Sequence, residues 1–416
     1  MLPAITSDRE HGYRYRALLA LPRADYITSY EPLVDALTAT RRFRVAVAVP
    51  SDLSTSLSPR VEIYRCPFYL NGRQGAWLPF AIRRERAARA IVDQLRPHVV
   101  IVPSDVSDTL LGLVMAARRA GAKIAYVQGA MVFPDYVTRN AETDRVRLRA
   151  RPPIRRLMVG IAGRLLRACG VHVVTGVKGV LGEHADWLFV ANEAQRRIHE
   201  AAGHRSDRIV VSGAPFREAL EIRARRFSVE DSARIRAAMG IDCQPLVILL
   251  TKSLFRLGWA TREVQEELVK ALVAVIRQEL PAWHVVVKLH PAEDLTDYSY
   301  LADSHVRIVK DAAVEDLLLA ANLAIGIGGS SPALAAPILG VPVIVFSPAD
   351  VPMLSVHSET SEDCLVVRTL GELAVALRSA RPAGHIQRFR AAGHDWSPSE
   401  RIVKYLEQEL SLGISG

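Results

Sequence analysis

The chain has 416 residues, of which 50% are hydrophobic and 23% charged, and it contains no low-complexity tract, so a largely disordered protein is excluded. This length exceeds what one hydrophobic core usually organises, and we expect two domains of roughly 200 residues each. The net charge of +9 indicates an anionic partner, with a nucleotide, a nucleic acid and an acidic membrane surface as open alternatives.

The cysteines and the N-terminus indicate the compartment. The four cysteines lie far apart and form no C-x-x-C pair: Cys66, Cys169, Cys243 and Cys364. This spacing indicates neither a zinc site nor a disulfide framework, and it fits a reducing cytoplasm. The N-terminus lacks an apolar core of signal-peptide length, and no apolar run approaches the length of a membrane span. We therefore expect a protein that is neither exported nor membrane-spanning.

Short apolar runs alternate with helical patterns through the first half of the chain. The predicted strands are Tyr15 to Leu21, Phe43 to Val49, Val61 to Tyr64, Val99 to Val102, Lys123 to Val127, Trp187 to Val190 and Arg208 to Val211. Helices are predicted at Ala81 to Leu95 and Ser107 to Ala120. Continuous Val, Ile and Leu runs separated by helices are typical of a parallel sheet covered on both faces. This pattern predicts a doubly wound domain over residues 1–222.

The pattern restarts after a charged helical bridge at Glu218 to Gly240. The predicted strands are Leu246 to Leu250, His284 to Leu289, Val306 to Val309, Leu323 to Ile327 and Val341 to Phe346. The predicted helices are Arg262 to Leu280, Val314 to Ala321 and Pro332 to Leu339. A second doubly wound domain is thus expected at 240–385. The segment 386–416 is expected to pack back on the first domain through a helix that starts at Ser397-Pro-Ser-Glu.

The predicted fold class is α/β, with two Rossmann-like doubly wound domains facing across a cleft. Open parallel sheets bind ligands beyond the carboxyl ends of their strands. Several polar motifs directly follow predicted strands of the second domain. We therefore expect them on the rim of that cleft.

The strand His284 to Leu289 stops at His290-Pro291. Proline cannot continue a central ladder and favours extended geometry in the residue before it, so the His290 imidazole is expected at the strand tip. There it can donate a hydrogen bond to a nucleotide phosphate or ribose, and a charged ring would stabilise a leaving phosphate. The alternative is a histidine that caps the strand by binding a loop carbonyl.

A glycine- and serine-rich turn, Gly328, Gly329, Ser330 and Ser331, follows the predicted strand Leu323 to Ile327. The glycines permit close backbone approach, and the serines supply hydroxyl and N–H donors at the start of a helix. The turn therefore predicts a phosphate-binding helix N-terminus. It lacks the last glycine of the dinucleotide fingerprint and the Gly-Lys-Ser/Thr of a P-loop. An ordinary strand-to-helix connection is the alternative.

Two other strand ends of the second domain carry candidate ligand-binding residues. Lys252 follows the strand Leu246 to Leu250 and could neutralise a phosphate, or could be a solvated surface lysine. The base of a bound nucleotide is expected at the loop that begins at Lys310. Glu315 or Asp316 could accept hydrogen bonds from the ribose, or could favour the start of their helix.

Several motifs of other enzyme classes are absent from the sequence. It contains no D-x-D, no His/Cys/carboxylate cluster with metal-ligand spacing and no G-x-S-x-G. We therefore expect that any transfer of a sugar from a nucleotide-sugar substrate takes place without a metal or another cofactor. Backbone amides, Lys252 and His290 would then compensate the phosphate charge.

The segment from Arg139 to Arg167 is strongly basic. It has nine arginines and two acids, with apolar residues at helical spacing. A basic amphipathic helix of this kind predicts contact with an anionic membrane surface or a lipid-linked acceptor, and a core-packed helix with a solvated basic face is the alternative. No aromatics interleave and no nucleic-acid module is present, so nucleic acid is not an expected partner. The expected location is cytoplasmic, or peripheral on the inner face of the membrane.

Three segments, Lys288 to Pro291, Leu317 to Leu323 and Gly329 to Ile344, resemble the C-terminal half of GT-B enzymes of bacterial surface-polysaccharide synthesis. These include capsule sialyl- and Kdo-transferase-like proteins, with His-Pro and Ser-Ser motifs, and CDP-glycerol glycerophosphotransferases. The similarity covers roughly residues 245–350. The resemblance implies that His290, Ser330 and Ser331 bind the nucleotide phosphate and ribose of the donor.

The chain departs from these enzymes at Tyr126 to Ala130, which contains the candidate substrate-binding residue Gln128. Many of them have Gln-His-Gly here, whereas UDP-N-acetylglucosamine 2-epimerases, which share the fold, have a His-Val-Glu-Ala-Gly type of segment. The missing acid argues against epimerase chemistry, and the missing histidine leaves the acceptor site unlike either group. The glycine-rich turn usual after the first strand is replaced by Pro22 to Tyr30.

The predicted function is transfer of a sugar from a nucleotide-sugar to a glycan or lipid-linked acceptor in surface polysaccharide synthesis. A carboxylate of the first domain would deprotonate the acceptor hydroxyl. The candidates are Asp25, placed in the loop after the first strand, and Asp105, after the strand Val99 to Val102, although loop aspartates are commonly turn or cap residues. The alternatives are a CDP-glycerol-type polyol-phosphate transferase, in which His290 acts on the phosphoryl group, and a non-catalytic nucleotide-sugar-binding or scaffold protein.

Overall fold

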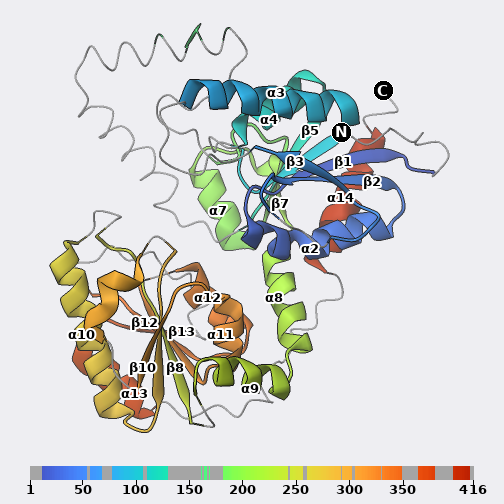
Figure 1. Ribbon diagram of the computed structural model, residues 1–416. Coiled ribbons are helices and arrows are strands. Elements are labelled where there is room, and N and C mark those ends of the chain that lie inside the picture. The colour runs from blue at the N-terminus through green and yellow to red at the C-terminus, as the bar shows by residue number, and fades with distance from the viewer. Residues whose placement is uncertain are drawn as a thin grey trace. The chain divides into compact units, whose positions relative to one another are not determined.

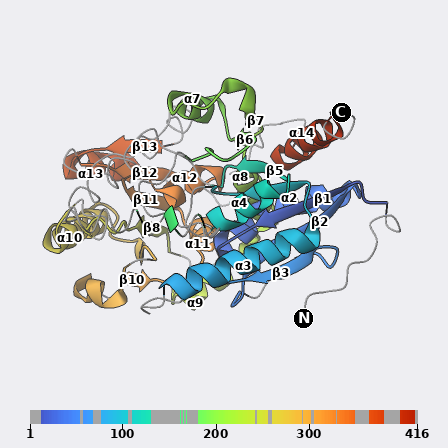
Figure 2. The same cartoon turned by 90° about the horizontal axis from the view of Figure 1, so that it is seen from above.

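The chain forms two compact units, Met1–Ala219 with Asp395–Gly416, and Leu220–His394. Each unit contains one parallel sheet with helices on both faces (Figures 1 and 2). The computed structural model describes residues 12–53, 57–67, 77–105, 110–129, 161, 164, 165, 168, 181–241, 244–255, 260–291, 293–301, 305–328, 330–348, 364–379 and 397–412. The two units are described separately.

The sheet of the first unit has seven strands in the order β3-β2-β1-β4-β5-β6-β7, all parallel. The strands are β1 (Tyr15–Ala20), β2 (Phe43–Pro50), β3 (Glu62–Cys66), β4 (Val99–Val102), β5 (Lys123–Val127), β6 (Trp187–Val190) and β7 (Ile209–Val211). The chain moves outward from β1 through β2 and β3 and then returns to the other side of β1 with β4. The strand order therefore reverses between β1 and β4.

Helices cover both faces of this sheet because alternate strand residues point to opposite faces. Leu18 packs in the core under α3 (Trp77–Leu95) and α4 (Leu111–Arg119), whereas Leu19 packs in the core under α2 (Ala24–Ala39) and α14 (Pro398–Leu412). The remaining helical segments are α7 (Glu193–Ala201), η1 (Ser206–Arg208) and α8 (Pro215–Arg226), which continues into the second unit.

The sheet of the second unit has six parallel strands in the order β10-β9-β8-β11-β12-β13. They are β8 (Leu246–Leu250), β9 (His284–Lys288), β10 (Val306–Val309), β11 (Leu323–Ile327), β12 (Val343–Phe346) and β13 (Cys364–Val367). The helices are α9 (Val229–Ala238), α10 (Arg262–Glu279), η2 (Leu295–Leu301), α11 (Val314–Ala320), α12 (Ser331–Ile338) and α13 (Leu370–Ser379). The strand order reverses between β8 and β11.

These two units confirm the predicted α/β class with two Rossmann-like, doubly wound domains. One correction concerns the segment after β1. Asp25 was expected in a loop, but it lies in the first turn of α2, where an acid is favourable beside the positive end of the helix dipole. Among the described helices, none is long and apolar enough to cross a bilayer.

Candidate functional site

The strand order of the second unit reverses between β8 and β11, which is where open parallel sheets bind ligands. Lys252 follows β8 and Gly328 follows β11. A Cβ atom placed on Gly328 would lie only 3.7 Å from Lys252 Nζ, so the ammonium group lies directly against the glycine turn. Gly328 has a φ of +61°, a conformation that favours glycine. The turn therefore leaves its backbone open to close approach beside a cation.

Lys252 is a buried base, with 7% of its surface exposed. Burial lowers the pKa of its amine to about 8, because a low-dielectric surrounding disfavours the charged form. At neutral pH the amine is still mostly protonated. A bound anion would stabilise this charge, so the position is suited to a phosphate group.

The N-terminus of α12 lies beyond the same turn. Ser330 is the N-cap residue, and its hydroxyl oxygen accepts a hydrogen bond from the Ala333 N–H at 3.3 Å. The backbone of Ser331 begins the helix, whereas its side chain and all of Gly329 lie outside the described residues. The first-turn N–H groups carry partial positive charge, so they can contribute to binding of an anion.

The end of β9 places His290 beside the end of β8, where Lys252 lies, because β9 pairs with β8 in the sheet. The His290 N–H donates to Glu293 Oε2 at 2.8 Å and to Thr251 Oγ1 at 3.1 Å, which fixes the main chain of this residue. Both His290 and Pro291 are exposed. The backbone of His290 is thus used within the protein, while its imidazole is accessible to a ligand.

Lys288 joins the ends of β9 and β10. Its Nζ donates to the Leu289 carbonyl at 3.1 Å and to the Lys310 carbonyl at 2.5 Å. Burial lowers the pKa of Lys288, while Asp311 and other nearby acids oppose this shift. The lysine of the Lys-Leu-His-Pro motif therefore binds main-chain carbonyls of the protein.

The candidate residues after β10 have protein partners of different kinds. Lys310 Nζ forms an ion pair with Asp294 at 3.0 Å, and Asp316 forms one with Arg223 of α8. Glu315 lies in the first turn of α11 and is half-buried. Glu315 is thus placed as the better of the two acids for reaching a ligand.

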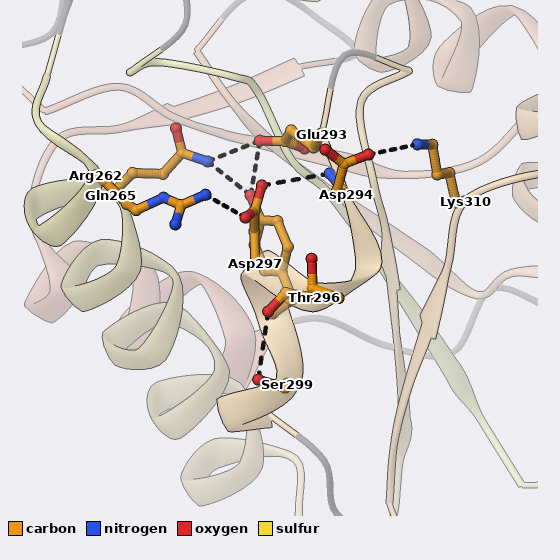
Figure 3. Close-up of polar contacts among 9 residues, drawn as sticks. Arg262, Gln265, Glu293, Asp294, Thr296, Asp297, Ser299 and Lys310 are labelled. Atoms are coloured by element: carbon orange, nitrogen blue, oxygen red, sulfur yellow. Dashed lines mark hydrogen bonds and ion pairs between the residues drawn. The ribbon is translucent and has the colours of Figure 1, made fainter.

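Glu293 was not identified from the sequence, although its carboxylate is the centre of a hydrogen-bond network at this edge of the sheet. It is completely buried and accepts hydrogen bonds from four donors: Thr251, Gln265, His290 and Tyr298. Figure 3 shows Glu293, in the turn that precedes η2, with its carboxylate directed at Gln265 of α10. An acid three residues after His290 was the only available sequence signal.

The first unit contains the predicted residue Asp105, which is completely buried. Its Oδ1 accepts the Gly182 N–H and its Oδ2 accepts the His184 N–H, both at 2.7 Å. Burial raises the pKa of this carboxyl, and these backbone hydrogen bonds oppose that shift. These hydrogen bonds hold the loop before β6 in place. The position of Asp105 therefore argues for a structural role and against a role as the general base.

Gln128 is also buried within the first unit. Its Oε1 accepts the Ala191 N–H at 2.9 Å and its Nε2 donates to Gln195 Oε1 at 2.6 Å, which joins β5 to the start of α7. The described position therefore gives Gln128 a structural function. Asp25, in contrast, is exposed and forms an ion pair with Arg23 at 2.8 Å.

Known structures resemble the whole described architecture. The UDP-GlcNAc 2-epimerase of Methanocaldococcus jannaschii in complex with UDP-GlcNAc and UDP has a TM-score of 0.61 and 15% identity, over 94% of this chain and 99% of that one. The kitacinnamycin glycosyltransferase has a TM-score of 0.59 and 17% identity, over 95% and 99%. The chain has a GT-B-like fold. The spinosyn forosaminyltransferase SpnP also matches, with a TM-score of 0.51 and 15% identity over 96% of this chain and 100% of that one.

Sequence comparisons do not add a closer relationship, because no protein-family model and no curated protein sequence match the chain. At these identities the structural similarity defines the fold. The same fold serves both epimerases and glycosyltransferases among the matched structures, so it does not by itself select a reaction.

Proposed function

We propose that the protein is a metal-independent glycosyltransferase that transfers a sugar from a nucleotide-sugar to a glycan or lipid-linked acceptor in surface polysaccharide synthesis. The observation that supports this most is the position of the buried Lys252 amine against Gly328 at the reversal of strand order. An amine, a glycine turn and a helix N-terminus together provide charge, close approach and N–H donors for a diphosphate.

In this proposal the second unit binds the donor. Lys252 and the start of α12 bind the diphosphate, and the exposed imidazole of His290, at the neighbouring strand end, binds a phosphate or the ribose. Glu315 is the candidate for a ribose hydroxyl. Among the similar structures, one is a complex with UDP-GlcNAc and UDP and two are glycosyltransferases, which agrees with this class of ligand.

The acceptor side of the proposal depends on the first unit. Asp25 is the remaining candidate for the general base, because it is exposed whereas Asp105 is buried and hydrogen-bonded to backbone. The membrane-contact segment Arg139 to Arg167 lies almost wholly outside the described residues. Membrane contact through it, and a cytoplasmic location, complete the proposal.

Product analysis tests the type of reaction. The purified protein is incubated with UDP-GlcNAc, CDP-glycerol and other nucleotide conjugates, each without an acceptor. A transferase slowly hydrolyses its donor to the free nucleotide and sugar, and we expect this result. Conversion of the free UDP-sugar to its 2-epimer would show an epimerase, glycerol phosphate release from CDP-glycerol would show a polyol-phosphate transferase, and binding with no product would show a scaffold.

A further inference from the structure

Glu293 connects the two strand ends of the proposed binding site through one carboxylate oxygen. Its Oε2 accepts the Thr251 hydroxyl at 2.5 Å and the His290 N–H at 2.8 Å. Thr251 directly follows β8 and precedes Lys252 in the chain, whereas His290 lies beyond β9. One oxygen therefore links the side chain of Thr251, the residue before Lys252, to the main chain of His290.

The other oxygen of Glu293 connects the site to a helix. Its Oε1 accepts Gln265 Nε2 at 2.7 Å and the Tyr298 hydroxyl at 2.6 Å. Gln265 of α10 in turn accepts the Phe255 N–H on its own Oε1 at 3.2 Å. The segment from Thr251 to Phe255, which contains Lys252, is thus held near its first residue by Glu293 and at its last residue by Gln265.

A carboxylate is the side chain that this position requires. An ionised carboxylate only accepts hydrogen bonds, and here four donors point at its two oxygens. These hydrogen bonds compensate its complete burial, which would otherwise be costly. An amide of the same shape would turn an N–H₂ group toward some of these donors. That group cannot accept a hydrogen bond, so those donors would lose their partner.

Tyr298 remains a donor to this carboxylate over a wide pH range, because burial and then the nearby Glu293 raise the pKa of its hydroxyl. Two ion pairs surround the cluster in Figure 3, Arg262 with Asp297 and Lys310 with Asp294. Each pair has one exposed partner, Arg262 and Asp294, and ion pairs that are open to solvent contribute little to stability. The buried Glu293 is therefore the group that determines the geometry.

The geometry points to Glu293 as a positioning residue, which acts with Gln265 to hold Lys252 and His290 as a prearranged pair for the phosphates of a nucleoside diphosphate. This inference rests on the proposed function for the identity of the ligand. Because Glu293 is completely buried, its effect on a ligand in this inference passes through the two strand ends. Its removal should weaken phosphate binding through Lys252 more than it weakens the fold of the unit.

The first experiment needs no ligand. Hydrogen–deuterium exchange of the free protein is compared between wild type, Glu293→Gln and the control Glu266→Gln, which removes a half-buried acid of α10 paired with Lys270. We expect faster exchange in peptides that contain Thr251 to Phe255 and His290 in Glu293→Gln, no change at β11, and no change anywhere in the control. Unchanged exchange at Phe255 and His290 in Glu293→Gln would overturn the inference.

The second experiment measures coupling to Lys252. UDP affinity is titrated for wild type, Glu293→Gln, Lys252→Met and the double variant, with pyrophosphate as a probe that lacks the base. We expect each single change to weaken binding about tenfold or more, and Glu293→Gln to have little further effect once Lys252 is absent. Glu293→Asp, which keeps the charge on a shorter side chain, should restore part of the affinity. Additive losses would instead show a general structural role and overturn the inference.

Two further measurements separate the possible failures. If Glu293→Gln does not fold, Gln265→Met keeps the carboxylate but removes one of its four donors and the contact with the Phe255 N–H, and the same exchange and coupling are measured with that variant. If folded wild-type protein binds neither UDP nor pyrophosphate, the proposed function fails, and the exchange experiment alone then decides whether Glu293 positions the two strand ends.

Discussion

Lys252 and His199 are both buried bases, yet their surroundings indicate opposite roles. Lys252 Nζ lies against the Gly328 turn at a strand end. His199 of α7 packs against the rings of Tyr126 and His204, and among the described residues neither of its ring nitrogens has a hydrogen-bond partner. Lys252 is thus placed to gain an anion, whereas His199 is placed to remain neutral in the core.

The first prediction is that Lys252→Met separates stability from binding. Burial lowers the pKa of this lysine from 10.5 to about 8. The charged lysine therefore destabilises the folded state below about pH 10.5, and this destabilisation reaches its full size below about pH 8. The substitution should leave the free energy of unfolding equal or higher at pH 7. Nucleotide binding should fall by about 1.5–3 kcal/mol, because a charge-assisted contact is lost.

Urea unfolding and UDP titration of the same Lys252→Met sample check this prediction. The matched control is Lys270→Met, which removes an exposed lysine of α10. Parallel loss of stability and binding in Lys252→Met would instead indicate that the lysine is part of the structural core.

The second prediction concerns the acid sensitivity of His199. Burial and then His204 lower the pKa of His199 from 6.5 to about 4 in the folded protein. The unfolded chain therefore takes up a proton first as the pH falls, and stability is lost between pH 6.5 and 4. This loss amounts to about 2 kcal/mol at pH 5. His199→Leu should remove it, as measured by urea unfolding at pH 7 and pH 5; an unchanged pH dependence would refute this account.

At the scale of elements, most strands were predictable from their apolar runs, whereas β13 was not. The predicted bounds of β8 and β11 agree with the structure, because both are continuous apolar runs buried on both faces and followed by turn residues. β13 was missed, since a four-residue run with Leu365 exposed does not distinguish a strand from other structure. α2 was missed in part because Pro32 lies inside it.

The candidate site shows the same limit. The places of Lys252, His290 and Gly328 follow from where the predicted strands end. The contacts of Asp105 do not, because its partners Gly182 and His184 lie far along the chain. Nor does the network of Glu293 follow from the sequence, since its donors come from four separate segments that only the tertiary fold brings together.

The third prediction concerns the β11–α12 turn. Gly328→Ala places a side chain where φ is +61° and within 3.7 Å of Lys252 Nζ, in the space proposed for a phosphate. Gly121→Ala is the matched control, because Gly121 has φ of +80° and nothing lies within 4 Å of its added Cβ. Both variants should lose about 1–2 kcal/mol of stability from the left-handed backbone. Only Gly328→Ala should lose UDP affinity; equal affinity in both variants would contradict the proposed site.

At the scale of the whole molecule, both units have the same design, in which strand order reverses beside the first strand of each sheet. In the first unit this reversal lies between β1 and β4, and Asp25 follows β1 in the first turn of α2. Proteins with this fold include epimerases and glycosyltransferases, so side chains at these edges, not the fold, determine the reaction. The net charge of +9 is consistent with an anionic ligand or surface.

The fourth prediction separates the two candidate bases of the first unit. Asp105→Asn turns an amide N–H₂ toward a backbone N–H, so we expect a loss of stability of about 1–3 kcal/mol, seen as a lower Tm. Asp25→Asn should keep the Tm, since the ion pair of Asp25 with Arg23 is exposed. The same substitution should lower kcat with little change in the affinity for the donor. A kcat equal to wild type in Asp25→Asn would exclude it as the base.

The most direct test of nucleotide binding by the second unit is a thermal-shift panel of the full chain against CMP, CDP, UDP and GDP and their sugar or glycerol conjugates. Binding stabilises a folded protein by about 2.7 kcal/mol when the ligand is at 100 times its Kd. We predict a selective rise in Tm with one nucleotide class, reduced in Lys252→Met and retained in Lys270→Met. No rise with any of these ligands, in protein shown to be folded, would contradict the assignment of a nucleotide-sugar site to Lys252, Gly328 and Ser330.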